Sequence, residues 1–156
     1  GVDLNRNFDA GWETITDRTA PSSERYRGTA PFCAPEAKML RDYTLRYPFG
    51  LTISYHAMGS MIYFEYGDND EINDQGHDLA SDIYDLTGYD LLNSTGVDAA
   101  GYKDWAIEDM QITSLTIEIG CQSVPLVERE AYSIFVRNLD VLPELAKWLK
   151  NHTNTV

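Results

Sequence analysis

The spacing of apolar residues along the chain predicts three strands. Residues 51–56 and 61–66 form two short runs that are rich in β-branched and aromatic side chains and are bounded by glycines. Residues 114–119 form a third run, which is apolar at every second position. We expect each strand to be buried on at least one face.

Four other segments are predicted to be helical, namely residues 35–47, 71–86, 102–109 and 130–150. Pro143 lies inside the last of them, so we expect it to kink that helix. Because strands alternate with helices, the pattern predicts a layered α/β fold.

Two segments between these elements are expected to be loops. Residues 9–31 are rich in Thr, Ser, Gly and Pro, and loops of this length usually carry function. Residues 93–101 are rich in Gly and Ala and are expected to be mobile. The polar string 2–8 precedes every predicted element, so we expect the chain to be an incomplete domain.

Composition and charge narrow the class of protein. With 43% apolar and 24% charged residues, the 156-residue chain is typical of one globular domain or part of one. No stretch approaches the roughly 18 apolar residues that span a bilayer, and no signal-peptide pattern opens the chain. The net charge of −13 repels phosphate backbones, which argues against nucleic acid as a partner.

The two cysteines do not fix the redox compartment. Cys33 and Cys121 lie far apart and form no C-x-x-C pair, so neither a zinc knuckle nor a redox motif is indicated. One disulfide and two free thiols are both compatible with the sequence.

Two polar positions are candidates for binding. Arg6 lies between two asparagines and offers a planar fork for a carboxylate, although a surface loop with capping asparagines is the simpler interpretation. His56 ends a predicted strand, where a neutral imidazole could bind zinc. A lone histidine is more often a hydrogen-bonded structural residue.

Glu118 interrupts the apolar run 114–119. Strand alternation could place its carboxylate on a solvated face. In a central strand the same carboxylate is costly unless it has a use, and near a metal-bound water it could act as a general base.

Together these segments resemble the zinc carboxypeptidase family, whose motifs occur here in the same order over nearly the whole chain. The string 1–8, Gly-Val-Asp-Leu-Asn-Arg-Asn-Phe, resembles the segment that binds the substrate carboxylate. Residues 26–37 resemble the segment that opens a helix. Residues 54–56 match the strand with the third zinc ligand, and residues 116–120 match the strand with the catalytic glutamate.

The resemblance implies a mixed-sheet α/β/α fold, of which residues 1–156 form the C-terminal part, and a peptide-hydrolysing zinc enzyme. His56 would be a zinc ligand, and Glu118 would take a proton from water and pass it to the leaving amine. Asn5 and Arg6 would hold the substrate carboxylate.

Within the family, residues 8–13 and 101–105 resemble the bacterial γ-D-glutamyl-diaminopimelate peptidases, which cut cell-wall peptides. Lys103 occupies the position that in the family faces the side chain after the cut bond. It would bind the second carboxylate of diaminopimelate, or it simply pairs with Asp104 or Glu108. Such a substrate favours a cell-envelope or secreted location over a cytoplasmic one.

The chain also departs from the family pattern. The H-x-x-E segment, with two zinc ligands, has no counterpart here, so we expect the chain alone to be inactive and its sheet to be covered by an absent N-terminal half or another chain. Cys33 stands where a Ser or Thr usually caps the helix, and Gly96 stands near the position of a substrate-covering tyrosine. An aspartoacylase-like amide hydrolase and a non-catalytic peptide-binding module are the alternatives.

Overall fold

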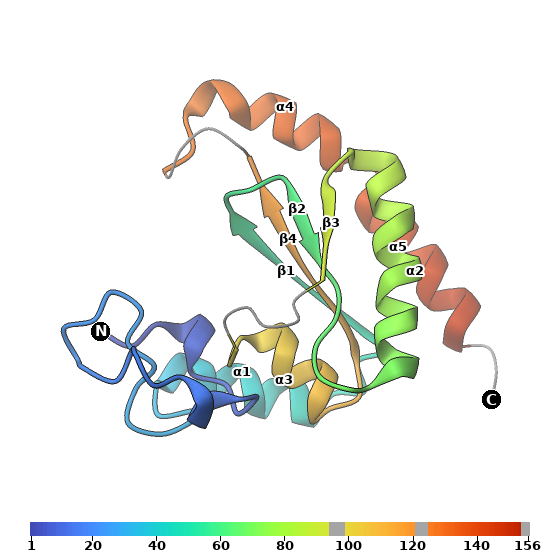
Figure 1. Cartoon of the computed structure of the whole chain (residues 1–156). Helices are drawn as coiled ribbons and strands as arrows, with labels where there is room; N and C mark the ends of the chain where they lie inside the picture. The colour runs from blue at the N-terminus through green and yellow to red at the C-terminus, as the bar shows by residue number, and fades with distance from the viewer. Residues whose placement is uncertain (94–98, 121–124, 154–156) are drawn as a thin grey trace.

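The computed structural model describes residues 1–93, 99–120 and 125–153 (Figure 1). In chain order its elements are η1 (Leu4–Arg6), η2 (Trp12–Thr14), α1 (Pro35–Arg46), β1 (Leu51–Ala57), β2 (Met61–Tyr63), α2 (Asp70–Thr87), β3 (Asp90–Leu92), α3 (Tyr102–Glu108), β4 (Thr113–Ile119), α4 (Glu128–Asn138) and α5 (Val141–Thr153). Within the described residues, no helix combines the length and apolarity needed to cross a membrane.

The strands form one mixed sheet in the order β1-β4-β2-β3. β4 pairs parallel with β1 on one side and antiparallel with β2 on the other, and β3 pairs parallel with β2. The predicted mixed α/β class is therefore confirmed. The second strand is shorter than predicted, since it ends at Tyr63, and β3 was not predicted.

One face of the sheet packs against α2 and α5, which lie side by side in Figure 1. Leu115 and Ile117 of β4 point into this core, and both are fully buried. The helices contribute Leu79 and Ile83 from α2, and Trp148 from α5. Burial of these apolar side chains is the main force that holds the helices to the sheet.

The other face of the sheet packs against α3, which contacts β4 and β1. A second apolar cluster then ties the N-terminal segment to this helix. The Phe8 ring lies 5.4 Å from Tyr102 and 5.8 Å from Trp105, both in α3, and 5.5 Å from Phe32. These contacts hold the segment that contains η1 beside the sheet.

Asn7 fixes the chain that leads into α1. Its amide is fully buried and donates to the carbonyl oxygens of Arg27 and Ala30, at 2.8 and 2.9 Å. Its Oδ1 accepts a hydrogen bond from the N–H of Ala34, which is the N-cap of α1. Cys33, at the expected capping position, is therefore not the N-cap. The side chain of Asn7, from elsewhere in the chain, anchors the start of α1 instead.

The prediction of one continuous helix over residues 130–150 was wrong. The structure has two helices, and the break falls at residues 139–140, between α4 and α5. Pro143 is the third residue of α5 and does not kink a continuous helix. It lies in the first turn, where a missing N–H leaves no intrahelical bond unmade.

The predicted loop 9–31 has a well-defined path. The guanidinium of Arg27 lies 3.7 Å from the Trp12 ring centroid, and the Trp12 indole donates to the Arg27 carbonyl oxygen at 3.0 Å. Cys33 is a free, exposed thiol. Residues 94–98, which include Gly96 and most of the predicted mobile loop, and Cys121 lie outside the described residues.

Candidate active site

His56 and Glu118 face each other across two paired strands. They are register partners in the parallel β1–β4 ladder, so their side chains leave the sheet on the same face. His56 Nδ1 lies 3.9 Å from Glu118 Oε1, and the two side chains are 31% and 19% exposed. The two residues are therefore neighbours in the sheet, while their chemical roles stay predictions.

The carboxylate of Glu118 is held in a state that favours proton uptake. Burial raises the pKa of this carboxyl, and the nearby imidazole of His56 partly offsets the rise. Its Oε2 atom is buried and has no hydrogen-bond partner among the residues that the structure describes. A desolvated carboxylate oxygen of this kind is a good proton acceptor for a reacting water.

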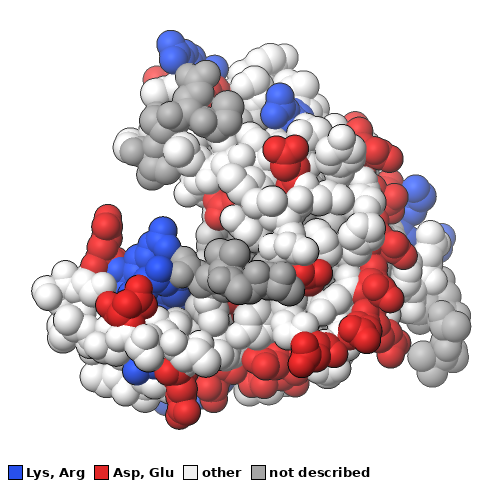
Figure 2. Space-filling view, in the orientation of Figure 1, with Lys and Arg blue, Asp and Glu red and all other residues white. Residues whose placement is uncertain are grey.

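Glu118 opens into a cleft of about 390 Å³ between the sheet and the N-terminal segment (Figure 2). Asn5, Arg6 and Arg25 line it from the N-terminal side, and Tyr63 lines it from β2. The cleft is also lined by Ala57, Met58, Lys103, Asp104 and Thr116. His56 is not among the lining residues. Its imidazole lies beside Glu118, which does line the cleft.

Local structure fixes Asn5 and Arg6 on one wall of the cleft. Asp3 caps η1 by accepting a hydrogen bond from the N–H of Asn5 at 3.0 Å. A Cβ atom on Gly101 would lie 2.8 Å from Asn5 Oδ1, so any larger residue there would displace the Asn5 side chain from its present position. Arg6 is 9% exposed, and its Nη1 donates to the Asn5 carbonyl oxygen at 2.5 Å.

Lys103 is buried and belongs to the lining of the cleft. Its Nζ lies 2.7 Å from Asp104 Oδ1 and donates to the carbonyl oxygen of Glu65 at 2.7 Å. The two side chains are 7% and 6% exposed, so this is a buried ion pair. The pairing with Asp104 anticipated from the sequence is present, but on a buried helix, and the same ammonium borders the cleft.

The donor set of these residues decides whether they fit a zinc ion. A catalytic zinc usually has three protein ligands. Across residues 1–93, 99–120 and 125–153, no group of three or more His, Cys, Asp or Glu side chains could hold a metal. His56 suits one ligand position, with the carboxylate of Glu118 beside it. The described residues therefore fit one side of a zinc site and do not complete it.

Among the lining residues that sequence reasoning did not identify are Thr116, Tyr63 and Arg25. Thr116 lies two positions before Glu118 on the same strand face, and Tyr63 is its partner across the sheet, so strand alternation could have found both. Arg25 lies in the long loop, where no periodic signal exists. Its only sequence cue is its place beside the Tyr-x-Gly string 26–28.

Comparisons with known proteins identify relatives of this chain. The profile of the zinc carboxypeptidase family matches residues 1–136. The chain is 32% identical over 148 residues to gamma-D-glutamyl-L-diamino acid endopeptidase 1 of Lysinibacillus sphaericus, which covers 89% of this chain and 37% of the relative. It is 33% identical over 82 residues to mast cell carboxypeptidase A of Homo sapiens, which covers 51% of this chain and 20% of the relative.

Solved structures show the same fold. Thrombin activatable fibrinolysis inhibitor superposes with a TM-score of 0.79 at 24% identity, over 97% of this chain and 44% of that one. The murein-tripeptide amidase MpaA of Escherichia coli O157 superposes with a TM-score of 0.59 at 21% identity, over 92% and 58%. The chain thus spans less than two thirds of the length of each relative. With the family profile matched over most of its residues and the predicted motifs gathered around one cleft, the chain belongs to the zinc carboxypeptidase family.

Proposed function

We propose that this chain supplies the catalytic base, one zinc ligand and the carboxylate-binding residues of a zinc-dependent peptidase. The observation that carries the proposal is the pairing of His56 with Glu118 beside a cleft that also contains Arg6. Family membership favours this reading over an aspartoacylase-like hydrolase.

In the proposed reaction, Asn5 and Arg6 hold the terminal carboxylate of the peptide and align the bond to be cut. Glu118 takes a proton from the attacking water and transfers it to the leaving amine as the carbon–nitrogen bond breaks. His56 would be one ligand of a zinc ion at this site, and such an ion would supply Lewis acidity for the carbonyl and the water.

The proposed substrate is a bacterial cell-wall peptide with a γ-D-glutamyl-diaminopimelate bond. Support comes from the similarity to the Lysinibacillus endopeptidase, whose name specifies a bond between γ-D-glutamate and an L-diamino acid. The position of Lys103 also supports it, because a buried ammonium on the cleft lining could share its charge between Asp104 and the second carboxylate of diaminopimelate. This substrate favours a cell-envelope or secreted location over a cytoplasmic one.

We further propose that the remaining zinc ligands and the rest of the sheet come from an N-terminal half of the same domain or from another chain. β1 is an edge strand of the described sheet. Several apolar side chains on α1 and α4 are exposed, among them Met39 (67%), Leu45 (58%), Tyr132 (78%) and Phe135 (63%). Edges and patches of this kind are usually covered in complete proteins.

The test uses a longer polypeptide that carries the remaining ligands. It is incubated with the tripeptide L-Ala-γ-D-Glu-meso-diaminopimelate, and the products are separated by chromatography with and without a zinc chelator. Release of diaminopimelate that stops on chelation is expected. Binding of the tripeptide without any cleavage would instead support a non-catalytic peptide-binding module.

A further inference from the structure

The cleft is more cationic than the rest of the molecule. The protein has a net charge of −13, yet three of the residues that line the cleft are Arg6, Arg25 and Lys103. The carboxylates on the lining are those of Asp104 and Glu118. Figure 2 shows basic atoms beside the hollow on a surface where acidic side chains predominate elsewhere.

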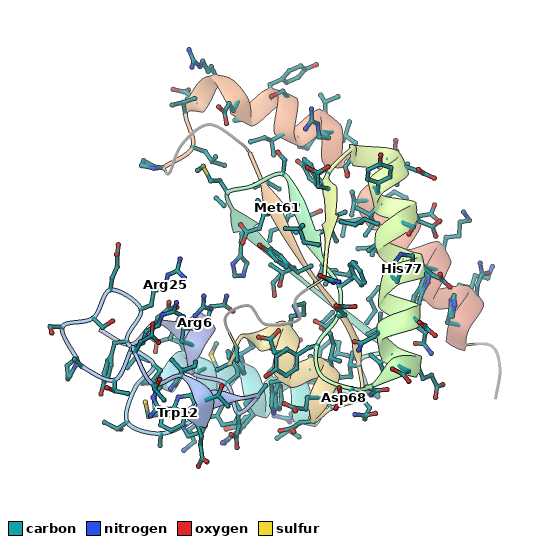
Figure 3. All side chains as sticks on the ribbon, viewed as in Figure 1. Arg6, Trp12, Arg25, Met61, Asp68 and His77 are labelled. Atoms are coloured by element: carbon teal, nitrogen blue, oxygen red, sulfur yellow. The ribbon has the colours of Figure 1, made fainter. Side chains whose placement is uncertain are left out.

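These charged residues differ in how deeply they are buried. The ammonium of Lys103 is buried and is matched by Asp104 at 2.7 Å. Arg6 is 9% exposed and is held in place by η1. Arg25 is exposed and comes from the loop before α1, 19 positions along the chain from Arg6. Figure 3 shows both arginines on the same side of the open region that faces the sheet.

The two guanidinium groups suit two separate carboxylates. Both belong to the lining of one cleft of about 390 Å³, which is large enough for more than one residue of a peptide. Each guanidinium can bind a carboxylate through two parallel hydrogen bonds. Because Arg6 is the more deeply placed of the two, it suits the end of the peptide, while Arg25 at the exposed rim suits the part that lies nearer to solvent.

We propose that Arg25 is a specificity-determining residue that binds a carboxylate on the acyl side of the bond to be cut. The inference rests on the proposed function. It adds a preference for a carboxylate on the acyl side, which Asn5, Arg6 and Lys103 do not supply. In a γ-linked D-glutamyl residue, the α-carboxylate is free and lies on the acyl side of the cut bond, separated from the scissile carbonyl by the Cα atom and the side-chain methylene groups. In a peptide whose α-carboxylate is amidated, the same position holds a neutral carboxamide of nearly equal size.

This pair of peptides separates charge recognition from shape. The complete enzyme is assayed on L-Ala-γ-D-Glu-meso-diaminopimelate and on its α-carboxamide, with native Arg25 and with Arg25→Ala. The preference for the carboxylate peptide in kcat/KM is expected to fall by about 5-fold or more in the variant, because one guanidinium–carboxylate contact at a partly exposed site is lost. Arg46→Ala removes the same charge from an exposed helical site away from the cleft and is expected to leave the preference unchanged.

A binding measurement gives a second, independent readout. In the Glu118→Gln background, the dissociation constants of both peptides are measured by calorimetry with and without Arg25→Ala. A loss of affinity confined to the carboxylate peptide supports the proposal. Equal losses on both peptides, no loss on either, or the same change in Arg46→Ala would overturn it. Cleavage of neither peptide would count against the proposed function, while the binding measurement would still decide on Arg25.

Discussion

His56 and Glu118 occupy partner positions on β1 and β4, so the register of two parallel strands sets the distance between an imidazole and a carboxylate. Alternation in β4 turns Leu115 and Ile117 towards the apolar core and Glu118 towards the cleft. A shift of the pairing by one residue would reverse these directions, so packing of the core also protects the geometry of the site.

The first prediction concerns Glu118 as the base. In the complete enzyme, Glu118→Gln keeps the shape of the side chain but removes its basicity, so kcat should fall by at least about 100-fold. For the native enzyme, activity should be lost as the pH falls through the pKa of Glu118, because the base must be ionised. Burial places that pKa above the usual carboxyl value. A pH–rate profile checks both, and near-native activity of the variant would remove Glu118 from this role.

The second prediction is that this chain alone binds zinc weakly and cleaves no peptide. Its described residues offer His56 but no group of three suitable ligands. Calorimetric titration of the purified chain with zinc should therefore show no stoichiometric, submicromolar site. His56→Ala is the matched variant. A tight site that disappears in this variant would show that further ligands are present.

The third prediction concerns Lys103 in the complete enzyme. If its ammonium binds the second carboxylate of diaminopimelate, Lys103→Ala should lower kcat/KM about 10-fold or more for the diaminopimelate peptide, since a charged hydrogen bond is worth roughly 1.5–3 kcal/mol. The loss should be small for the lysine-containing analogue, which lacks that carboxylate. Equal losses on both peptides would confine Lys103 to its structural pairing with Asp104.

The fourth prediction is that Asn7 stabilises the fold around the cleft. Asn7→Ala leaves the carbonyl oxygens of Arg27 and Ala30 and the N–H of Ala34 without this buried partner. The free energy of unfolding should fall by about 3 kcal/mol, as measured by denaturant titration. Asn151→Ala, at an exposed helical position, serves as the control. Equal stability of the two variants would show that other contacts hold the segment.

The fifth prediction concerns the acidic residues at the end of α3. Burial, together with repulsion from Asp9 and other carboxylates, raises the pKa values of Glu108 and Asp109. The folded state therefore binds their protons more tightly than the unfolded chain does, and these groups weaken the fold once the pH exceeds their folded pKa values. Asp9→Asn should raise Tm by about 1–3 °C at pH 7 and leave it unchanged near pH 3. A gain of equal size at both pH values would exclude a charge effect.

The elements that the sequence predicted well are those with strong local signals. β1 and β4 consist of apolar, β-branched runs, and glycines or turns delimit them. β3 has only three residues, Asp90–Leu92, which are too few to show alternation. The break between α4 and α5 was missed because apolar residues continue at helical spacing across it, and Pro143 is the stronger local signal for a change of direction.

The residues of the candidate site also differ in how well the sequence predicts them. Glu118 could be picked out because a carboxylate in an apolar strand breaks a local pattern. The anchoring role of Asn7 could not, because its hydrogen bonds reach residues 20 to 27 positions away. Arg25 was missed for a related reason, since only the folded path of the loop brings it to the cleft.

The parallel pairing of β1 with β4 also has a consequence for the order of folding. Each partner pair in that ladder is separated by 62 positions, as for Leu51 and Thr113. Contacts between residues so distant in sequence form slowly, because a long loop must close first. During synthesis the histidine is made long before its partner, and the two can meet only when β4 has left the ribosome and entered the middle of the sheet. The site is therefore expected to be among the last parts of the chain to assemble, which keeps incomplete chains from having a formed active centre.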